Sequence, residues 1–221
     1  MFPASQTELE FDNFFYSLGY SRVSEDAGNS PMFKNADYVD KNNKIIVELK
    51  ILEKEHFSNG GVIDSLSTLI VQPDIIDENG FGTYSFSIPE QNRKNRHDSF
   101  EEPLRQVLKK ANRQLRETKS FYSDNGVYSG YVIIAQTGLE SLPVEITAQL
   151  TSHILNHDFS EIDGVVICSP HQTLMNPITR KVNGECISIT KDWDFLLSQQ
   201  CKSIADQWCH FLENGGHSRL P

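Results

Sequence analysis

The sequence predicts an α/β protein in which helices flank a central mixed sheet. Two short apolar runs rich in β-branched residues, at 131–135 and 164–168, have the composition of strands buried on both faces. An amphipathic helical segment precedes each run, at 101–119 and 143–155, and this alternation is typical of α/β crossover connections. A chain of 221 residues is long enough to bury such a core as one domain.

The N-terminal segment predicts a helix followed by a strand. A helix is expected at 5–19, because apolar residues recur there at helical spacing and Gly19 can end the helix. A short strand is expected at 21–24. The residues that form the apolar stripe of this helix are Phe11, Phe14, Phe15 and Leu18.

Residues 37–51 predict a β-hairpin. Asn42 and Asn43 can adopt the positive φ angles of a tight two-residue turn. With the turn centred between them, Tyr38 faces Val47 across the ladder.

The expected elements of the whole chain follow the order αβββαβαβ: a helix, three strands, and then two repeats of a helix followed by a strand.

The hairpin has an apolar face and a charged face, because successive side chains of a strand point to opposite sides. Glu48 and Lys50 lie on the charged face, and Asp37, which faces Glu48, lies beside them. Two carboxylates directly opposite each other are roughly 5 Å apart at Cβ and repel. The residues expected to face a core are Ile45, Val47, Leu49 and Ile51.

Three changes relieve the repulsion between two such acids. One acid holds a proton, Lys50 neutralises part of the charge, or a divalent cation lies between them. A pocket with two carboxylates and open water positions suits Mg²⁺, which favours one or two carboxylates together with water and phosphate oxygens. Lys50 would then be placed to orient a water or to stabilise charge on a phosphate.

The remaining segments are expected to form an insertion and a C-terminal extension of the single domain. Residues 54–100 are broken by Gly and Pro, with a strand expected at 84–88. An edge strand is expected at 185–190. A helical segment is expected at 192–213, with an interruption near Gln199.

The charge is unevenly distributed along the chain. The net charge is −10, but residues 91–119 hold nine basic and four acidic residues, a net charge of +5, whereas the rest carries −15. A local basic face on an acidic body can bind the phosphates of DNA, and it can equally be an ordinary solvated helix face. The candidate DNA-binding residues are Arg93, Lys94, Arg96, Lys109, Lys110, Arg113, Gln114 and Arg116.

The hairpin resembles the PD-(D/E)XK nuclease superfamily. Glu48-Leu49-Lys50 begins eleven residues after Asp37, at the end of an apolar strand, although Ala36 stands where the motif name has proline. The resemblance implies a restriction-endonuclease-like αβββαβαβ core, with residues 54–100 as an insertion between its third strand and the next helix. It also implies Asp37, Glu48 and the backbone carbonyl of Leu49 as ligands of Mg²⁺, for which Mn²⁺ can substitute, and Lys50 as the catalytic lysine.

The same resemblance implies contributions from two helices. In that superfamily a glutamate of the first helix often approaches the metal site, and Glu8 is preferred for this role over Glu10. The alternative is that Glu8 is an acid favoured by the helix dipole. In the helix after the Glu-x-Lys strand, Gln114 and Lys110 are candidates to point at the scissile phosphate, or are ordinary surface residues.

The sequence therefore predicts a Mg²⁺-dependent nuclease acting on DNA, of endonuclease type. Two alternatives stay open: an inactive nuclease-fold subunit that binds nucleic acid or protein, and an unrelated α/β binding module. Phosphate-binding Gly-rich loops and a Gly-x-Ser-x-Gly elbow are absent from the sequence, which disfavours nucleotide-binding and serine-hydrolase folds. Four cysteines without a CxxC pair, no signal peptide and no membrane-spanning run favour the cytoplasm, with a homo-oligomer or partner subunit possible.

Overall fold

The structure is a computed structural model of the 221-residue chain. Only the backbone is described for four short strand segments, 72–76, 82–85, 171–175 and 182–185. The backbone and side chains are described for residues 6–28, 32–53, 101–137, 144–156, 158–170, 186–191 and 194–214.

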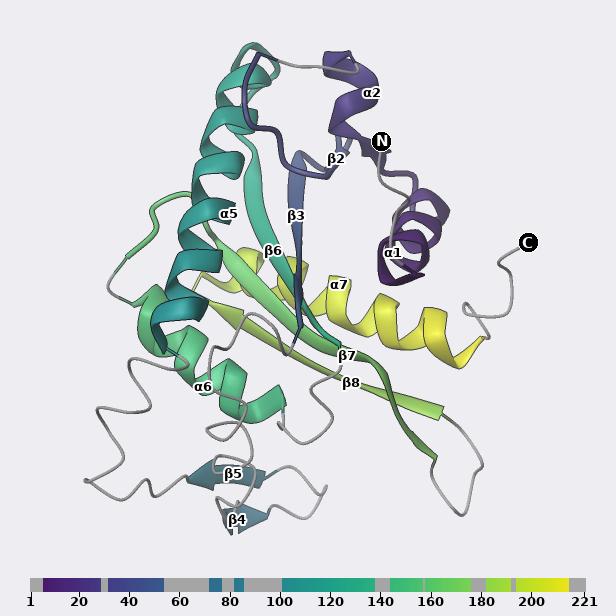
Figure 1. Ribbon diagram of the computed structural model, residues 1–221, viewed down its shortest axis with the longest axis vertical. Coiled ribbons are helices and arrows are strands. Elements are labelled where there is room, and N and C mark those ends of the chain that lie inside the picture. Colours follow the sequence, from purple (N-terminus) through teal and green to yellow (C-terminus); the bar gives the residue numbers. More distant parts are fainter. Residues whose placement is uncertain are drawn as a thin grey trace.

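A six-stranded mixed sheet forms the centre of the protein (Figure 1). Its strand order is β1-β2-β3-β6-β7-β8, in which β3, β6 and β7 are parallel to one another and the remaining neighbours are antiparallel. This arrangement confirms the predicted α/β class with a mixed central sheet. The strands are β1 (Ser21–Arg22), β2 (Tyr38–Asp40), β3 (Ile45–Leu52), β6 (Ser129–Gln136), β7 (Gly164–Met175) and β8 (Val182–Thr190).

Helices cover both faces of the sheet (Figure 1). The helices α5 (Glu102–Phe121) and α6 (Val144–Leu155) pack on one face, and α1 (Gln6–Ser17) and α7 (Phe195–Glu213) pack on the other. Each face has its own apolar cluster, because alternate residues of the central strands point to opposite sides. The sheet is therefore the middle layer of three.

The face of β3 that carries the acidic residue lies under α5. Ile46 and Leu52 belong to the cluster beneath α5 and α6, whereas Ile45, Val47 and Leu49 belong to the cluster with α1 and α7. Glu48 has the same strand parity as Ile46 and so points toward α5. The predicted separation of the two faces of this strand is confirmed.

Most predicted elements are present, with three local differences. The strand expected at 21–24 ends at Arg22, and Val23–Ala27 form the short helix α2 instead, with the Val23 N–H donating to the Asp37 carbonyl. The helix α7 continues from Phe195 to Glu213, without the interruption expected near Gln199. Its buried side chains keep helical spacing past that point, so packing maintains the helix.

The turn of the predicted hairpin is the third difference. The connection has four residues, 41–44, and the positive φ angle belongs to Lys44, at 56°, rather than to the asparagines. Asp40 caps this loop by accepting the N–H groups of Asn42 and Asn43. The predicted pairing of Tyr38 with Val47 is preserved, because lengthening the loop by one residue on each side leaves the register unchanged.

The predicted insertion at 54–100 lies largely outside the described residues. Two strands within it, β4 (Gln72–Ile76) and β5 (Gly82–Ser85), form a separate antiparallel pair, so the strand expected at 84–88 overlaps the end of β5. In the C-terminal part of the chain, β8 is at the edge of the main sheet, as expected for 185–190. None of the helices that are described has the length and apolar character required to span a bilayer.

The contact between α1 and α7 supplies a large part of the apolar cluster on their face of the sheet. Trp208 is 1% exposed, and its ring stacks on Phe11 at a centroid distance of 4.1 Å and meets Phe14 edge-on at 5.1 Å. Because α1 also carries Glu8 and Asp12, this aromatic contact holds one wall of the candidate site in place.

We expect Trp208→Ala to lower the free energy of unfolding by about 3–5 kcal/mol, because it leaves a cavity between the two helices. Urea unfolding followed by circular dichroism measures the change. The matched control on the same helix is Phe195→Ala, where the side chain is 75% exposed and the change should stay below about 0.5 kcal/mol. Equal effects of the two substitutions would contradict this account of the packing.

Candidate active site

Asp37 is held at the start of β2 by contacts from both sides. Its N–H donates to the Val47 carbonyl, and its Oδ2 accepts the N–H of Leu49 at 2.9 Å. Its Oδ1 accepts a charged hydrogen bond from Arg22 at 3.0 Å. The carboxylate therefore lies across the end of the β2–β3 ladder, opposite Glu48, where the hairpin was predicted to place it.

Glu48 is buried, and its two oxygens have different surroundings. Its side chain is 1% exposed, and Oε1 accepts a hydrogen bond from Lys50 Nζ. Oε2 is buried and has no hydrogen-bond donor among the described residues. A buried carboxylate oxygen without a donor is costly in a folded protein, so this oxygen is the one that a proton or a cation would stabilise.

The pKa values of both acids are raised. Burial raises the pKa of Glu48 well above its ordinary value, and the charge of Asp37 and a hydrogen bond shared with the Asp37 side chain raise it further, while Lys50 opposes the change. Burial also raises the pKa of Asp37, against the lowering effects of the Leu49 N–H, Arg22 and Lys50. Asp37 and Glu48 are called the acidic pair below. Ionisation of one of them disfavours ionisation of the other.

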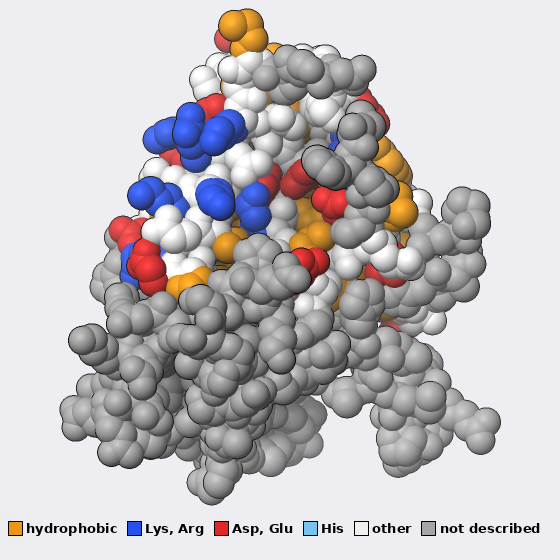
Figure 2. Space-filling view, viewed as in Figure 1, with side chains coloured by type: hydrophobic (Ala, Val, Ile, Leu, Met, Phe, Trp, Pro, Cys, Tyr) orange, Lys and Arg blue, Asp and Glu red, His pale blue; other side chains and the backbone are white. Residues whose placement is uncertain are grey.

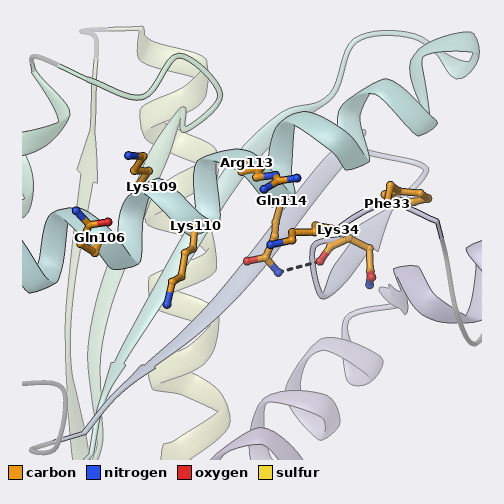
Figure 3. Close-up of a pocket in the computed structure, with 8 residues that line it drawn as sticks. Phe33, Lys34, Gln106, Lys109, Lys110, Arg113 and Gln114 are labelled. Carbon is orange, nitrogen blue, oxygen red and sulfur yellow. Dashed lines mark hydrogen bonds between the residues drawn. The ribbon is translucent and has the colours of Figure 1, made fainter.

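Lys50 links the acidic pair to α5. Its Nζ donates to Glu48 and also to Gln114 Oε1, at 2.8 Å. The amide nitrogen of Gln114 in turn donates to the Asn35 carbonyl at 3.0 Å, the bond drawn in Figure 3. Gln114, which was predicted to point at a phosphate, instead has both ends of its amide engaged in positioning Lys50 and the strand that carries Asp37.

The segment before Asp37 is fastened to α5 at consecutive residues. The N–H of Lys34 donates to Glu117 Oε2 at 2.7 Å, and the N–H of Ala36 donates to the buried Thr118 hydroxyl at 2.8 Å. The Gln114 bond to Asn35 lies between these two. One turn of α5 therefore fixes the approach of the chain to Asp37.

Arg22 is a site residue that the sequence did not indicate. Its guanidinium pairs with Asp12 at 2.6 Å as well as with Asp37, and its Cζ lies 4.5 Å from the centre of the Tyr38 ring. Burial opposes its charge, but Tyr38 and the two carboxylates together outweigh that effect and the pKa of Arg22 is raised. The signal that the sequence offered for Arg22 was the strand expected at 21–24. The pairing of β1 with β2 brings Arg22 opposite Tyr38.

Of the two glutamates considered on α1, Glu8 is the one that acts electrostatically on the pair. Its charge contributes to raising the pKa of Asp37. Glu10 is 2% exposed on the buried side of α1 and accepts a hydrogen bond from the Gln6 amide at 3.3 Å. That Glu8 rather than Glu10 joins the site stays a prediction.

With all four nearby acids ionised, the charges around the pair leave an excess of two negatives. Four acids, Glu8, Asp12, Asp37 and Glu48, lie with two bases, Arg22 and Lys50, and a divalent cation would balance them. Within the described part of the chain, however, no three His, Cys, Asp or Glu side chains are gathered as a ready metal cage. The residues fit a cation such as Mg²⁺, which takes one or two carboxylates and completes its shell with water and phosphate.

A basic cleft of about 650 Å³ adjoins the acidic pair (Figures 2 and 3). Gln114 belongs to both features, because it lines the cleft and bonds Lys50. Lysine and arginine side chains gather over α5 in Figure 2. The residues that line this basic cleft are Phe33, Lys34, Asn35, Gln106, Lys109, Lys110, Arg113 and Gln114.

The cleft brings together part of the predicted DNA-binding set. Lys109 and Lys110 are exposed, and Arg113 is exposed while paired with Glu117 at 2.7 Å. Arg116 is exposed on the same helix but does not line the cleft. Lys34 and Phe33 were not predicted, since they come from the loop before β2. The remaining candidates, Arg93, Lys94 and Arg96, lie outside the described residues.

In comparisons with known proteins, no family model, curated protein or solved structure matched this chain. The case for a function therefore rests on the chemistry of the acidic pair, Lys50 and the basic cleft.

The raised pKa of Glu48 has a consequence for stability. Because folding raises this pKa above 4.5, the folded protein holds more protons than the unfolded chain above that pH, and the free energy of unfolding falls as the pH rises. We expect the free energy of unfolding to fall less between pH 4.5 and pH 8 in Glu48→Gln than in wild type, because the variant has no carboxyl to ionise at this position. Urea unfolding in EDTA at each pH measures the change.

Asp124→Asn, at an exposed carboxylate after α5, is the control and should change stability by less than about 0.5 kcal/mol at either pH. A Glu48→Gln curve parallel to that of wild type would show that this carboxyl is not the strained group.

Proposed function

We propose that the protein is a metal-dependent nuclease that hydrolyses DNA phosphodiester bonds at the acidic pair. The observation that carries the proposal is the buried Glu48 Oε2, which accepts no hydrogen bond from the described part of the chain and lies beside Asp37 and Lys50. A structural ion pair would satisfy both oxygens of a buried glutamate, whereas a cation site keeps one oxygen available for the cation.

The fold supports this proposal through the order of its elements. With α2 and the separate β4–β5 pair set aside, α1, β1, β2, β3, α5, β6, α6 and β7 follow the αβββαβαβ order of the restriction-endonuclease-like core. The strands β2 and β3 carry Asp37 at their open end and Glu48 and Lys50 within β3. We propose that the chain has this core and that its site corresponds to the PD-(D/E)XK site, with Ala36 in place of proline.

The metal would be Mg²⁺, with Mn²⁺ as a substitute. Asp37 and Glu48 would hold it, with the carbonyl of Leu49 and the carboxylate of Glu8 as further ligands. When bound, such an ion lowers the pKa of a water and offsets the negative charge of a phosphate. Arg22 keeps Asp37 oriented through Oδ1, and the Leu49 N–H does so through Oδ2.

Lys50 is the group placed to act on the reacting phosphate. Its ammonium is fixed by Glu48 and Gln114, and its side chain is 20% exposed, so it can meet a phosphate at the cleft. There it would orient the attacking water and stabilise the charge that develops on phosphorus-bound oxygens. A water oxygen forms a bond to phosphorus, and one ester P–O bond breaks to leave a phosphate monoester and an alcohol.

A second candidate function is favoured by one observation. Both oxygens of Asp37 already accept hydrogen bonds, from Arg22 and from the Leu49 N–H, as in a site that has lost its cation. In that case the protein would be an inactive nuclease-fold subunit that binds DNA or protein through the basic cleft. Calorimetric titration with Mn²⁺ separates the two functions, since only the nuclease requires a site that Glu48→Gln weakens.

We expect wild-type protein to cleave plasmid and oligonucleotide DNA with Mg²⁺ or Mn²⁺ and to be inactive in EDTA. Asp37→Ala, Glu48→Ala and Lys50→Ala should each lower the cleavage rate at least about 100-fold, because each removes a ligand or a charge needed in the transition state. Gel electrophoresis of end-labelled DNA measures the rate. Lys202→Ala, at an exposed lysine of α7, is the control. Cleavage by Asp37→Ala at the wild-type rate would remove the proposal.

The basic cleft generates a separate expectation for DNA binding. Each lysine that contacts a phosphate releases a counterion, so Lys110→Ala should weaken DNA binding and reduce the slope of log affinity against log salt by about 1. Fluorescence anisotropy over a series of salt concentrations measures this slope. Lys202→Ala should leave it unchanged, and equal slopes for both variants would place DNA elsewhere on the surface.

A further inference from the structure

An aromatic ring stands in the wall of the basic cleft, beside its charged side chains. Phe33 lines the cleft next to Lys34, at the opposite end from Lys109 and Lys110 (Figure 3). Phe33 is only partly buried where it packs against the core cluster. Its partly exposed ring gives the cleft an apolar surface in addition to charged side chains, and such a lining suits a ligand with both characters.

The ring of Phe33 is held by other aromatic rings. It stacks on Phe121 with a centroid distance of 5.0 Å and an interplanar angle of 26°. Phe121 meets Tyr122 edge-on at 4.9 Å, and Tyr122 lies 5.4 Å from Tyr128. Both tyrosines are 4% exposed, so the row of rings is anchored in the core and ends at the cleft. A flat ring that fits against Phe33 would extend this row.

The cleft combines the two features by which proteins hold unpaired nucleic acid strands. Such sites have basic side chains along the phosphates and aromatic side chains on which bases stack. The bases of a duplex are stacked on one another and are not free to meet Phe33. A cavity of about 650 Å³ lies in the size range of small-ligand sites and so has room for a nucleotide or two.

The cleft and the acidic pair share Gln114, which bonds Lys50. A strand whose phosphate lies at Lys50 therefore has its neighbouring nucleotide in the cleft, next to Phe33. Resting on the proposed function, we propose that the substrate is an unpaired DNA strand, single-stranded or at a frayed end, and that Phe33 is the stacking platform for a base beside the scissile phosphate.

The test compares single-stranded and double-stranded DNA of the same sequence. A fluorescein-labelled oligodeoxynucleotide, alone or annealed to its complement, is titrated with protein in EDTA and followed by anisotropy, so that no cleavage occurs. We expect wild type to bind the single strand more tightly. Phe33→Leu should weaken single-strand binding by roughly 5- to 100-fold, the usual range for the loss of one stacked base, and change duplex binding less than about two-fold.

Two further variants control this result. Tyr16→Leu, at an aromatic side chain on α1 that is 45% exposed, should bind both probes like wild type. Phe33→Trp keeps a stacking ring and should bind the single strand at least as well as wild type, with tryptophan fluorescence quenched on binding. That quenching is a readout that does not depend on whether Phe33→Leu folds, and circular dichroism establishes the folding of each variant.

The outcomes separate this inference from the proposed function. Tighter binding of the duplex, equal weakening of both probes by Phe33→Leu, or no added quenching in Phe33→Trp would overturn the stacking platform. Single-strand binding that needs Phe33, without cleavage in Mn²⁺, would overturn the nuclease and leave the platform in place. Cleavage of duplex DNA that is insensitive to Phe33→Leu would leave the nuclease in place and overturn the platform.

Discussion

The arrangement of this protein depends on one electrostatic constraint, the burial of the Glu48 carboxyl beside Asp37. A carboxylate in that position costs free energy unless a positive charge or a proton offsets it. Lys50 satisfies one oxygen and leaves the other without a donor among the described residues. Because a central strand under a helix is the least adaptable part of a sheet, the strain cannot be relieved by moving the side chain into solvent.

The helix α5 covers the buried Glu48 carboxyl and holds the residues around it in place. Its apolar stripe, which includes Leu104, Leu108 and Leu115, packs on the sheet, and its polar side chains Gln114 and Thr118 bond to Lys50 and to the chain before Asp37. The same helix carries the exposed lysines of the cleft on its remaining face. A single amphipathic element thus fixes the core, the acidic pair and the basic cleft.

Local patterns in the sequence were sufficient for the hairpin, the faces of β3 and the order of helices and strands, since these depend on periodicity and on residues close in sequence. Contacts between distant segments were not predictable in this way. Arg22 reaches Asp37 only because β1 pairs with β2, and Gln114 reaches Lys50 only because α5 crosses β3. The turn also differed, because Asp40 caps a four-residue loop in which Lys44 takes the positive φ angle.

The hydrogen bonds between residues 34–36 and α5 connect the basic cleft to the acidic pair. The backbone of this segment is bonded at each residue to one turn of the helix, and Asp37 follows it directly. A ligand that displaces the helix along its axis must therefore carry Asp37 with it and alter its separation from Glu48. Binding in the cleft is consequently coupled to the distance between the carboxyl groups of Asp37 and Glu48.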